Sequence, residues 1–279
     1  MESALAAADS DASHALAVEL DKICIAFPEA RGGSFVAVEN ATLAVREGEF
    51  VAIVGPTGCG KSTLLNVAAG LLRPSSGRCN VGGAPVIGVN RQAGYLFQAD
   101  ALMPWKTAIE NVAIGLEVRG VQRAKARAEA ASWLSRVGLA AFHDRYPHQL
   151  SGGQRKRVGL AQVLILHPKL LLMDEPFGPL DAQTRALMGE LLLDLWSADR
   201  KAVMFVTHDL EEAIALADRV VIMSAGPRAR IIGDHKVPLS RPRDITESRH
   251  LPGFIETHKA IWQQLKGEVL KAYAESANA

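Results

Sequence analysis

A glycine-rich segment at residues 55–62 carries the side chains whose chemistry is easiest to interpret. It reads Gly-Pro-Thr-Gly-Cys-Gly-Lys-Ser and fits the pattern GxxxxGK[ST] between an apolar run and an amphipathic stretch. Glycines in such a turn let backbone N–H groups point at phosphate oxygens, and the start of the following helix adds partial positive charge. Lys61 would neutralise the β- and γ-phosphates of a nucleotide, and the Ser62 hydroxyl would be a ligand of Mg²⁺. The predicted phosphate-binding residues are Gly55, Pro56, Thr57, Gly58, Cys59, Gly60, Lys61, Ser62 and Thr63.

Two adjacent carboxylates follow another apolar run, Leu-Leu-Leu-Met at residues 170–173. Asp174, at the tip of this expected strand, suits a position beside the metal ion. Glu175 would then polarise a water molecule for attack on the γ-phosphate. An apolar run that ends in Asp-Glu is weak evidence alone. Downstream of a phosphate-binding loop, it indicates nucleotide hydrolysis.

A second candidate anion site lies at residues 150–154, Leu-Ser-Gly-Gly-Gln, before Arg-Lys-Arg-Val. The Ser151 hydroxyl suits an N-cap, and the glycines at a helix start would let the backbone approach an anion. One nucleotide does not need two phosphate sites from one chain. Two identical chains placed head to tail solve this, because each would close its second site over the nucleotide of the other. That second site comprises Ser151, Gly152, Gly153 and Gln154.

The elements that must position these side chains alternate between buried strands and helices. Nearly apolar runs at residues 50–54, 170–173, 203–206 and 220–223 are typical of a parallel sheet covered on both faces. Helices are expected at residues 61–72 and 210–217, each after such a run. This order predicts an open α/β fold whose functional residues lie at the carboxyl ends of the strands.

Two further helical regions depart from this alternation. Residues from about 117 to 137 read as helical and no strand-like run interrupts them, which indicates a helical subdomain inserted into the α/β body. Its expected apolar face comprises Val121, Ala124, Ala128, Ala131 and Leu134. The final helix carries an apolar stripe that either packs on the protein's own core or binds a partner. This stripe comprises Phe254, His258, Ile261, Leu265 and Val269.

Composition narrows the class of protein. The 279 residues are 48% hydrophobic and 22% charged, which is usual for a globular protein with a sizeable core. A formal net charge of +1 argues against nucleic acid as the main partner. Three scattered cysteines indicate a reducing compartment. The start of the chain has neither the basic nor the apolar region of a secretory signal, and no apolar run is long enough to cross a membrane. We therefore expect a cytosolic protein that meets a membrane only through a partner.

Taken together, these motifs resemble the nucleotide-binding subunit of ABC transporters, and within that family the nitrate, sulfonate and taurine importer group. The resemblance covers about residues 20–243. It implies an α/β phosphate-loop NTPase (RecA-like) core with an antiparallel β subdomain and an inserted α-helical subdomain. The implied ATP-binding domain spans residues 18–240, with the core at about 18–97 and 156–240 and the helical subdomain at about 98–155. Residues 1–17 would be a flexible N-terminus and 241–279 a C-terminal helical extension.

The resemblance also implies roles for residues that lie outside the first motifs. Gln98 in Tyr-Leu-Phe-Gln would sense the metal ion and the attacking water, and the loop after it would meet a membrane subunit. His208 in Thr-His-Asp would contact the γ-phosphate, and Asp181 in Gly-Pro-Leu-Asp would reach across a dimer interface. An aromatic residue would stack on adenine, with Phe27 preferred and Phe35 as the alternative. The implied catalytic residues are Lys61, Gln98, Glu175 and His208, and the implied metal-binding residues are Ser62, Gln98 and Asp174.

Three positions within these motifs call for comment. Gln162 stands where the family often has arginine, and Pro179 replaces the commoner alanine before Asp181. Neither change touches the residues expected to carry the chemistry, so activity should survive. Cys59 either simply fits the phosphate-binding loop or, when oxidised, blocks nucleotide binding.

By this resemblance the chain would be an ATPase that uses ATP and Mg²⁺ and works as an ATP-dependent dimer. The dimer would contain either two copies or this chain and a related cassette, and two intact half-sites favour two copies. Its partners would be two transmembrane permease subunits and a substrate-binding protein, with the chain held peripherally on the cytoplasmic face of the inner membrane. The imported substrate would be nitrate, a sulfonate, taurine or a similar small anion, although an exporter stays open. The rival interpretations are a soluble ABC ATPase acting on nucleic acid or ribosomes, and another phosphate-loop enzyme such as a kinase.

Overall fold

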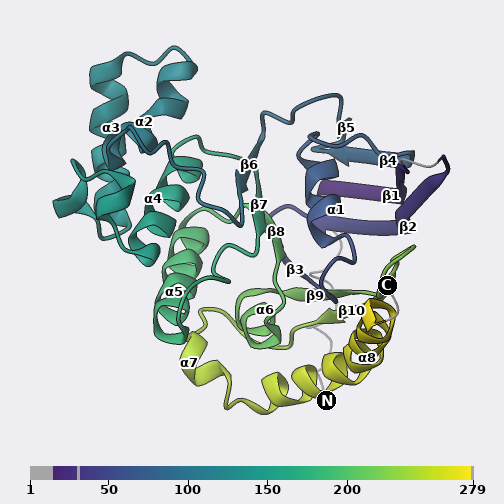
Figure 1. Ribbon diagram of the computed structural model, residues 1–279. Helices are drawn as coiled ribbons and strands as arrows, with labels where there is room; N and C mark the ends of the chain where they lie inside the picture. Colours follow the sequence, from purple (N-terminus) through teal and green to yellow (C-terminus); the bar gives the residue numbers. More distant parts are fainter. Residues whose placement is uncertain (1–14, 30–31, 278–279) are drawn as a thin grey trace, which may run out of the picture.

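Two β-sheets form the body of the molecule (Figure 1). The computed structural model describes residues 15–29 and 32–277. The smaller sheet is antiparallel in the order β2-β1-β4-β5, and the larger sheet has the order β10-β9-β3-β8-β7-β6. The smaller sheet is made of β1 (Leu16–Pro28), β2 (Ser34–Arg46), β4 (Ser76–Val81) and β5 (Ala84–Pro85). The larger sheet is made of β3 (Phe50–Val54), β6 (Ala93–Leu96), β7 (Leu170–Asp174), β8 (Ala202–Val206), β9 (Arg219–Met223) and β10 (Ile231–Lys236).

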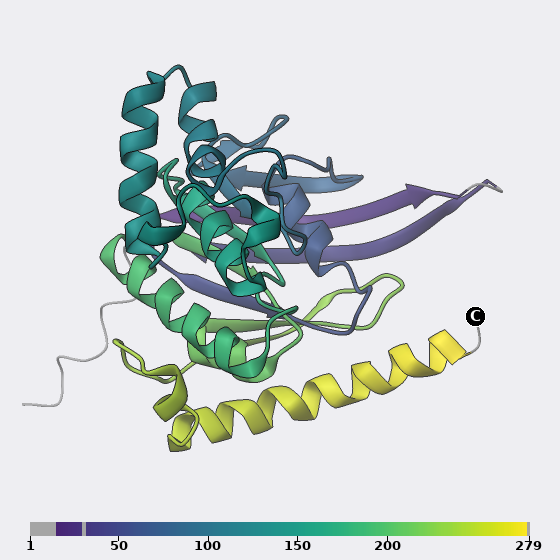
Figure 2. The same ribbon diagram turned by 60° about the vertical axis from the view of Figure 1, so that its left-hand side comes forward.

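Helices cover the larger sheet, and a separate helical region lies to one side of it (Figures 1 and 2). The helices of the α/β body are α1 (Lys61–Ala68), α5 (Ala182–Ala198), α6 (Leu210–Leu216) and α7 (Ile245–Ser248). The helical region between β6 and β7 contains α2 (Ala108–Val118), α3 (Arg123–Arg136), η1 (Ala140–Phe142), η2 (Pro147–Gln149) and α4 (Gly152–Leu164). The long helix α8 (Pro252–Ala277) follows α7.

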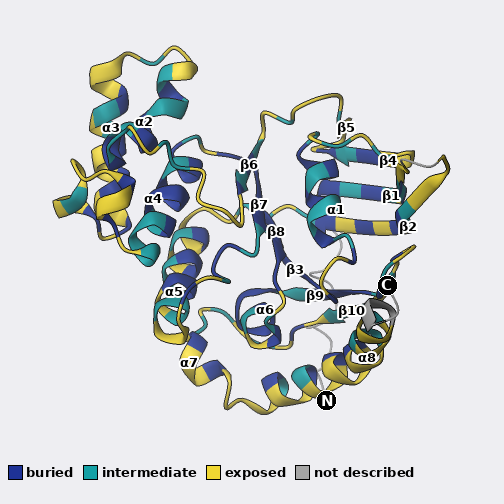
Figure 3. Ribbon diagram, viewed as in Figure 1, coloured by how far each residue is buried: buried dark blue, intermediate teal, exposed yellow. Residues whose placement is uncertain are grey.

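The apolar runs of the sequence become strands that are buried on both faces. β3, β7, β8 and β9 pair in parallel, and all five residues of β3 and of β8 are buried (Figure 3). Successive side chains of a strand point to opposite faces. Phe50, Ala52 and Val54 accordingly join the core beneath α4, α5 and α6, whereas Val51 and Ile53 join the core shared with the smaller sheet and α1. The predicted α/β fold is therefore confirmed.

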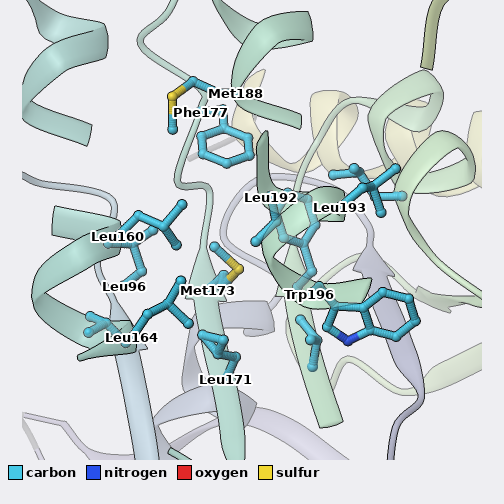
Figure 4. Packing of buried hydrophobic residues seen from close by; sticks show 14 of the residues in the cluster. Leu96, Leu160, Leu164, Leu171, Met173, Phe177, Met188, Leu192, Leu193 and Trp196 are labelled. Carbon is cyan, nitrogen blue, oxygen red and sulfur yellow. The ribbon is translucent and has the colours of Figure 1, made fainter. Parts of the chain in front are cut away.

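Close packing in the first of these cores fixes α4 and α5 against β7, the strand that leads into Asp174 and Glu175. Figure 4 shows side chains of β6, β7, α4 and α5 in one apolar cluster. Its members include Leu96, Leu160, Leu164, Leu171, Met173, Phe177, Met188, Leu192, Leu193 and Trp196. Phe50 adds edge-to-face contact with Trp196, with ring centroids 5.8 Å apart.

Several helical expectations need correction. The helix expected at 61–72 ends at Ala68, because Gly70 adopts φ +68° and its N–H donates to Val67 O. The region expected to be helical at about 117–137 contains the end of α2 and the whole of α3, which are separated at Gly120 with φ +85°. The expected apolar face was also wrong, because Ala124 and Ala131 are exposed. The buried face of α3 comprises Ala126, Ala130, Trp133 and Leu134.

The two ends of the described chain can be compared with the expectations for residues 1–17 and for the final helix. β1 begins at Leu16, inside the segment 1–17 that we expected to be flexible, and residues 1–14 lie outside the described residues. On α8, Phe254, Ile261 and Leu265 are buried in the main core, so the stripe packs on the protein itself. Among the described residues, no helix combines the length and apolar character that crossing a membrane requires.

Candidate nucleotide-binding site

The predicted phosphate-binding loop joins β3 to α1, at the carboxyl end of a central strand. Gly58 and Gly60 adopt positive φ, and a Cβ on Gly60 would lie 2.6 Å from Val38 Cγ2 of β2. Only glycine fits there, and its conformation turns the chain directly into α1. The N–H groups of the first turn of a helix have no partner within the helix, so this loop presents donors suited to phosphate oxygens.

Lys61 lies beneath this loop. Its Nζ donates to Gly55 O at 2.9 Å and to Pro56 O at 3.0 Å, and the side chain is buried. These two carbonyls keep the ammonium group beside the loop, where a phosphate would compensate its charge. Cys59 is also buried, and burial raises the pKa of its thiol. A buried, protonated thiol reacts poorly, so the structure favours the interpretation that Cys59 simply fits the loop.

Ser62, in the first turn of α1, and Asp174, the last residue of β7, lie together as a metal site would require. Ser62 Oγ donates to Asp174 Oδ1 at 2.7 Å. Burial raises the pKa of Asp174, and the neighbouring charge of Glu175 acts in the same direction while the Ser62 hydrogen bond opposes it. A cation placed between these oxygens would reverse that effect, because it stabilises the carboxylate.

Two predicted catalytic residues, Gln98 and His208, contact one carboxylate oxygen of a third, Glu175. Glu175 Oε2 lies 3.4 Å from Gln98 Nε2 and 3.2 Å from His208 Nδ1. Gln98 follows β6, Glu175 follows β7 and His208 follows β8, so three adjacent parallel strands deliver one residue each. Side chains that are 77 and 33 residues from Glu175 in the sequence therefore share one point at the carboxyl edge of the sheet.

Backbone geometry sets the direction of Glu175. The residue has φ +42°, an uncommon conformation for a residue with a side chain. Its N–H donates to Val206 O at 2.9 Å and its carbonyl accepts from Gly178 N at 3.2 Å. These bonds hold the carboxylate just beyond β7, where it is only partly exposed. A conformation of this kind is commonly retained at functional sites.

A set of polar contacts that sequence reasoning missed fixes the turn around His208. Asp209 caps α6 by accepting from the N–H groups of Glu211 and Glu212, and it pairs with Arg185 Nη1 at 2.7 Å. Buried Thr207 Oγ1 donates to Glu212 Oε2 at 2.5 Å. The sequence Thr-His-Asp-Leu-Glu-Glu could have indicated the cap of α6, but it does not identify Arg185 as the partner of Asp209.

A second group of polar contacts, also not predicted from the sequence, connects the loop at Gln98 to the start of α4. Asp100 pairs with Arg155 Nε at 2.8 Å and with Lys156 Nζ at 2.9 Å, and Lys156 also donates to Gln98 O. Burial opposes ionisation of Asp100, but these hydrogen bonds outweigh it and hold the pKa of its carboxyl below the usual value. The basic residues after the Ser151 segment therefore connect the two candidate sites.

The Ser151 segment has the helix start that its sequence predicts. Ser151 is the N-cap of α4, its Oγ accepts from Gln154 N at 3.2 Å, and its own N–H donates to Gln154 Oε1 at 2.9 Å. Figure 1 shows α1 and α4 on opposite sides of β6, β7 and β8. Among the described residues, no hydrogen bond or ion pair joins residues 151–154 to residues 55–63. The two candidate anion sites are therefore separate within one chain.

The remaining predicted site residues lie at two further places. Asp181 caps α5, accepting from Thr184 N at 3.0 Å and Thr184 Oγ1 at 2.7 Å, and these bonds lower the pKa of its carboxyl. Phe27 and Phe35 pair directly across the β1–β2 hairpin, and both side chains are exposed. Paired residues share one face of a sheet, so the structure brings both candidate adenine contacts together.

Known proteins share both this fold and this sequence pattern. The sequence profile described as "ABC transporter" matches residues 38–178. A taurine import ATP-binding protein of Burkholderia pseudomallei (strain 1710b) is 46% identical, covering 85% of this chain and 93% of that protein. An uncharacterised ABC transporter ATP-binding protein of Methanocaldococcus jannaschii is 44% identical, covering 88% of this chain and 90% of that one.

Solved structures agree with the sequence comparison. A dimeric ATP-binding cassette in a post-hydrolysis state, bound to ADP and phosphate, superposes with a TM-score of 0.71 at 30% identity and covers 80% of this chain and 100% of that chain. A subunit of an ABC transporter complex from Clostridium perfringens gives a TM-score of 0.70 at 25% identity, covering 86% of this chain and 93% of that one.

A central parallel sheet, a phosphate-binding loop before α1 and a carboxylate between an amide and an imidazole define a nucleotide-hydrolysing phosphate-loop protein. With a matching family profile and relatives that are 44–47% identical over more than four-fifths of its length, the chain belongs to the ABC transporter family. It is an ATPase of that family, and the resemblance seen in the sequence is confirmed.

Proposed function

We propose that this chain binds Mg·ATP between two copies of itself and hydrolyses it to drive a membrane importer of a small anion. The observation that carries the proposal is the convergence of Gln98, Glu175 and His208 beside the phosphate-binding loop. A carboxylate held between an amide and an imidazole is suited to activating one water molecule close to a phosphate.

Each residue of this cluster takes one part of the reaction. Lys61 and the N–H groups at the start of α1 bind the β- and γ-phosphates. Glu175 orients the attacking water and accepts its proton, and His208 holds the γ-phosphate and the Glu175 carboxylate in register. Gln98 bonds to the same carboxylate oxygen, so its position depends on whether the water molecule is bound there.

The residues around Ser62 fit Mg²⁺. Ser62 Oγ, the Asp174 carboxylate and the Gln98 amide supply oxygen donors, which this hard cation prefers. The described residues contain no cluster of three or more His, Cys, Asp or Glu side chains that could hold a metal ion. Mg²⁺ would therefore enter with ATP, whose phosphates complete its ligands. When bound, Mg²⁺ neutralises charge that develops on the phosphate oxygens.

The separation of the two anion sites supports a site shared between two chains. Ser151–Gln154 form a helix start that has no nucleotide phosphate to contact within its own chain, and a second copy in head-to-tail orientation would bring it to the phosphate-binding loop. A structurally similar cassette was solved as a dimer bound to ADP and phosphate. The role of Asp181 at the dimer interface and the stacking of Phe27 or Phe35 on adenine belong to the same proposal.

The importer assignment rests on the named relatives and on one exposed surface. Several relatives of 45–46% identity are taurine import proteins, which favours taurine or another small sulfonate over nitrate. After Gln98 the chain exposes Trp105, at 73%, beside the helical region. A loop tied to the reacting centre and ending in an exposed aromatic residue suits contact with a membrane subunit. The chain would then work at the cytoplasmic membrane face with two permease subunits and a substrate-binding protein.

Affinity purification of the full chain from detergent-extracted membranes of its own cells tests the transport role. We expect a polytopic membrane protein to co-purify, and uptake of labelled taurine to fail in cells that carry only the Glu175→Gln variant. Trp105→Ala should reduce co-purification while the isolated chain keeps its ATP turnover. Recovery of the chain with ribosomes or nucleic acid, and without any membrane protein, would overturn the importer and favour the soluble ABC alternative.

A further inference from the structure

The C-terminal helix α8 lines the same pocket as the phosphate-binding loop. This pocket has a volume of about 420 Å³. One wall holds Gly55, Pro56 and Thr57 of the loop together with His208. The facing wall comes from α8 and consists of Trp262, Leu265, Val269, Ala272 and Tyr273. A helix almost two hundred residues further along the chain therefore borders the place where the γ-phosphate would lie.

The two faces of α8 differ in burial. Its inner face is anchored, because Phe254, Ile261 and Leu265 are buried in the main core. Glu268 Oε2 accepts from Ala225 N at 2.9 Å, and Gln264 contacts His235 Nε2 at 3.1 Å. Figures 1 and 2 show α8 along one edge of the molecule, with its inner face against the α6 and β10 side. The helix is thus held rigidly beside the pocket.

The pocket-side face of α8 leaves large aromatic side chains exposed. Trp262 is 45% exposed and Tyr273 is 73% exposed. Eleven residues correspond to about three whole turns of an α-helix, so these two side chains lie on one face roughly 16 Å apart along the axis. Val269 lies between them on the same face. Aromatic residues concentrated at the edge of a polar site are typical of protein interfaces.

We propose that Trp262 and Tyr273 on α8 form part of the interface with a second copy of this chain, adding an apolar contact beside each shared nucleotide. The inference rests on the proposed function, because it requires the ATP-dependent dimer. The phosphate-binding loop and His208 are covered by the second copy in that dimer, and Trp262 and Tyr273 line the same pocket as these residues. The same surface would be covered only when ATP brings the two copies together.

Radical footprinting of the full Glu175→Gln chain tests which occupant covers α8. With Mg·ATP, labelling of Trp262 and Tyr273 should fall at protein concentrations where the dimer forms and stay unchanged at concentrations where the chain is monomeric. Protection at every protein concentration would show that nucleotide itself fills the pocket and would overturn the proposal. Unchanged labelling in the dimer would overturn it as well.

A pair of matched variants in the Glu175→Gln chain gives the energetic test. Trp262→Gln with Tyr273→Gln should weaken ATP-dependent dimerisation by at least about tenfold, as expected for buried aromatic interface residues. Binding of a fluorescent ATP analogue to the monomer should not change. The control, Ile255→Gln with Leu270→Gln, alters equally exposed apolar residues of α8 that do not line the pocket, and it should dimerise like its parent.

The outcomes separate this inference from the proposed function. If the Glu175→Gln parent dimerises and the aromatic variant dimerises equally well, α8 is no part of the interface while the shared site stands. If the parent stays monomeric with Mg·ATP, the shared site fails and the α8 interface fails with it. Loss of dimerisation in the Ile255 and Leu270 control would point to damage of the helix and contradict a specific contact.

Discussion

At the scale of single residues, the site depends on side chains that are poised before any nucleotide arrives. Lys61 is held by two carbonyls, Ser62 by Asp174, and Glu175 by contacts with Gln98 and His208. These contacts reduce the rearrangement that binding requires. They also give each substitution a specific expected outcome.

Replacing Ser62 with alanine should remove a ligand of Mg²⁺ and leave Asp174 without its hydroxyl partner. We expect ATP turnover to fall roughly 100-fold, the scale seen when one stabilising group is removed from a preorganised site. Ser62→Thr keeps the hydroxyl and should retain most of the turnover. Ser132→Ala, on the exposed surface of α3, is a neutral control. Turnover measured across Mg²⁺ concentrations checks this, and an unimpaired Ser62→Ala enzyme would exclude Ser62 as a ligand.

Residues within contiguous motifs were easier to predict from the sequence than the residues that pair with them only in the folded chain. Gly55–Ser62 and Asp174-Glu175 can be recognised because local spacing encodes them, and resemblance supplied Gln98 and His208. Asp100 and Arg185 were missed, because each pairs with a residue that only the folded chain brings near. Ion pairs of this kind have no periodicity or spacing that a single sequence could reveal.

At the scale of elements, short polar links hold the catalytic loops against their helices. The loop after β6 is tied to α4 by Asp100, Arg155 and Lys156. The turn after β8 is tied to α5 and α6 by Asp209 with Arg185 and by Thr207 with Glu212. Both links join a strand end to a helix, so the position of the reacting residues depends on helix position.

Asp100→Asn should loosen the loop that carries Gln98. Lys156 is 5% exposed and would lose a carboxylate partner, although its bond to Gln98 O would remain. Amide hydrogen exchange in residues 97–103 should speed up by roughly tenfold, corresponding to about 1.4 kcal/mol of lost local stability. Asp144→Asn, a change at an exposed carboxylate of the helical region, should leave this exchange unaltered. Equal exchange in Asp100→Asn and the original chain would show that the ion pairs do not fix the loop.

Glu212 gives the protein a defined dependence of stability on pH. Burial raises the pKa of its carboxyl from 4.5 to about 7, the charges of Asp209 and Glu175 add to this, and Thr207 and Arg185 oppose it. Between these two pKa values the folded chain keeps a proton that the unfolded chain releases, so the free energy of unfolding falls as pH rises. The loss through this window is about 3 kcal/mol.

Glu212→Gln cannot ionise and should not show this loss. The free energy of unfolding of the variant, relative to that of the original chain, should increase by up to about 3 kcal/mol between roughly pH 5 and pH 8. Urea unfolding at several pH values measures it. A difference between the two proteins that does not change with pH would contradict a raised pKa for Glu212.

Element boundaries and helix faces were less predictable than strands. The apolar strands are buried on both faces, so their composition alone identified them. Helix α3 is rich in alanine on more than one face, and packing against α2 and α4 determines which of these faces is buried. The pattern therefore predicted a helix there but placed its buried face wrongly.

At the scale of the whole molecule, the two candidate anion sites lie on separate parts of the chain. The phosphate-binding loop with Glu175 lies at one place and the start of α4 at another, which favours assembly of the complete site from two copies. Closure would couple ATP binding to movement of membrane subunits through the loop after Gln98. Trp262 and Tyr273 of α8 extend the surface that contains the phosphate-binding loop, and the motifs alone gave no indication that α8 lies beside this loop.

The central claim is that Glu175 activates water in a site completed by a second copy. Its most direct measurement compares ATP turnover of the full chain and of Glu175→Gln, with molecular mass determined in Mg·ATP. We expect the variant to lose at least about 100-fold in turnover and to accumulate as an ATP-bound dimer. Glu175→Gln that hydrolyses ATP at the original rate would contradict the claim, because another group would then have to activate the water.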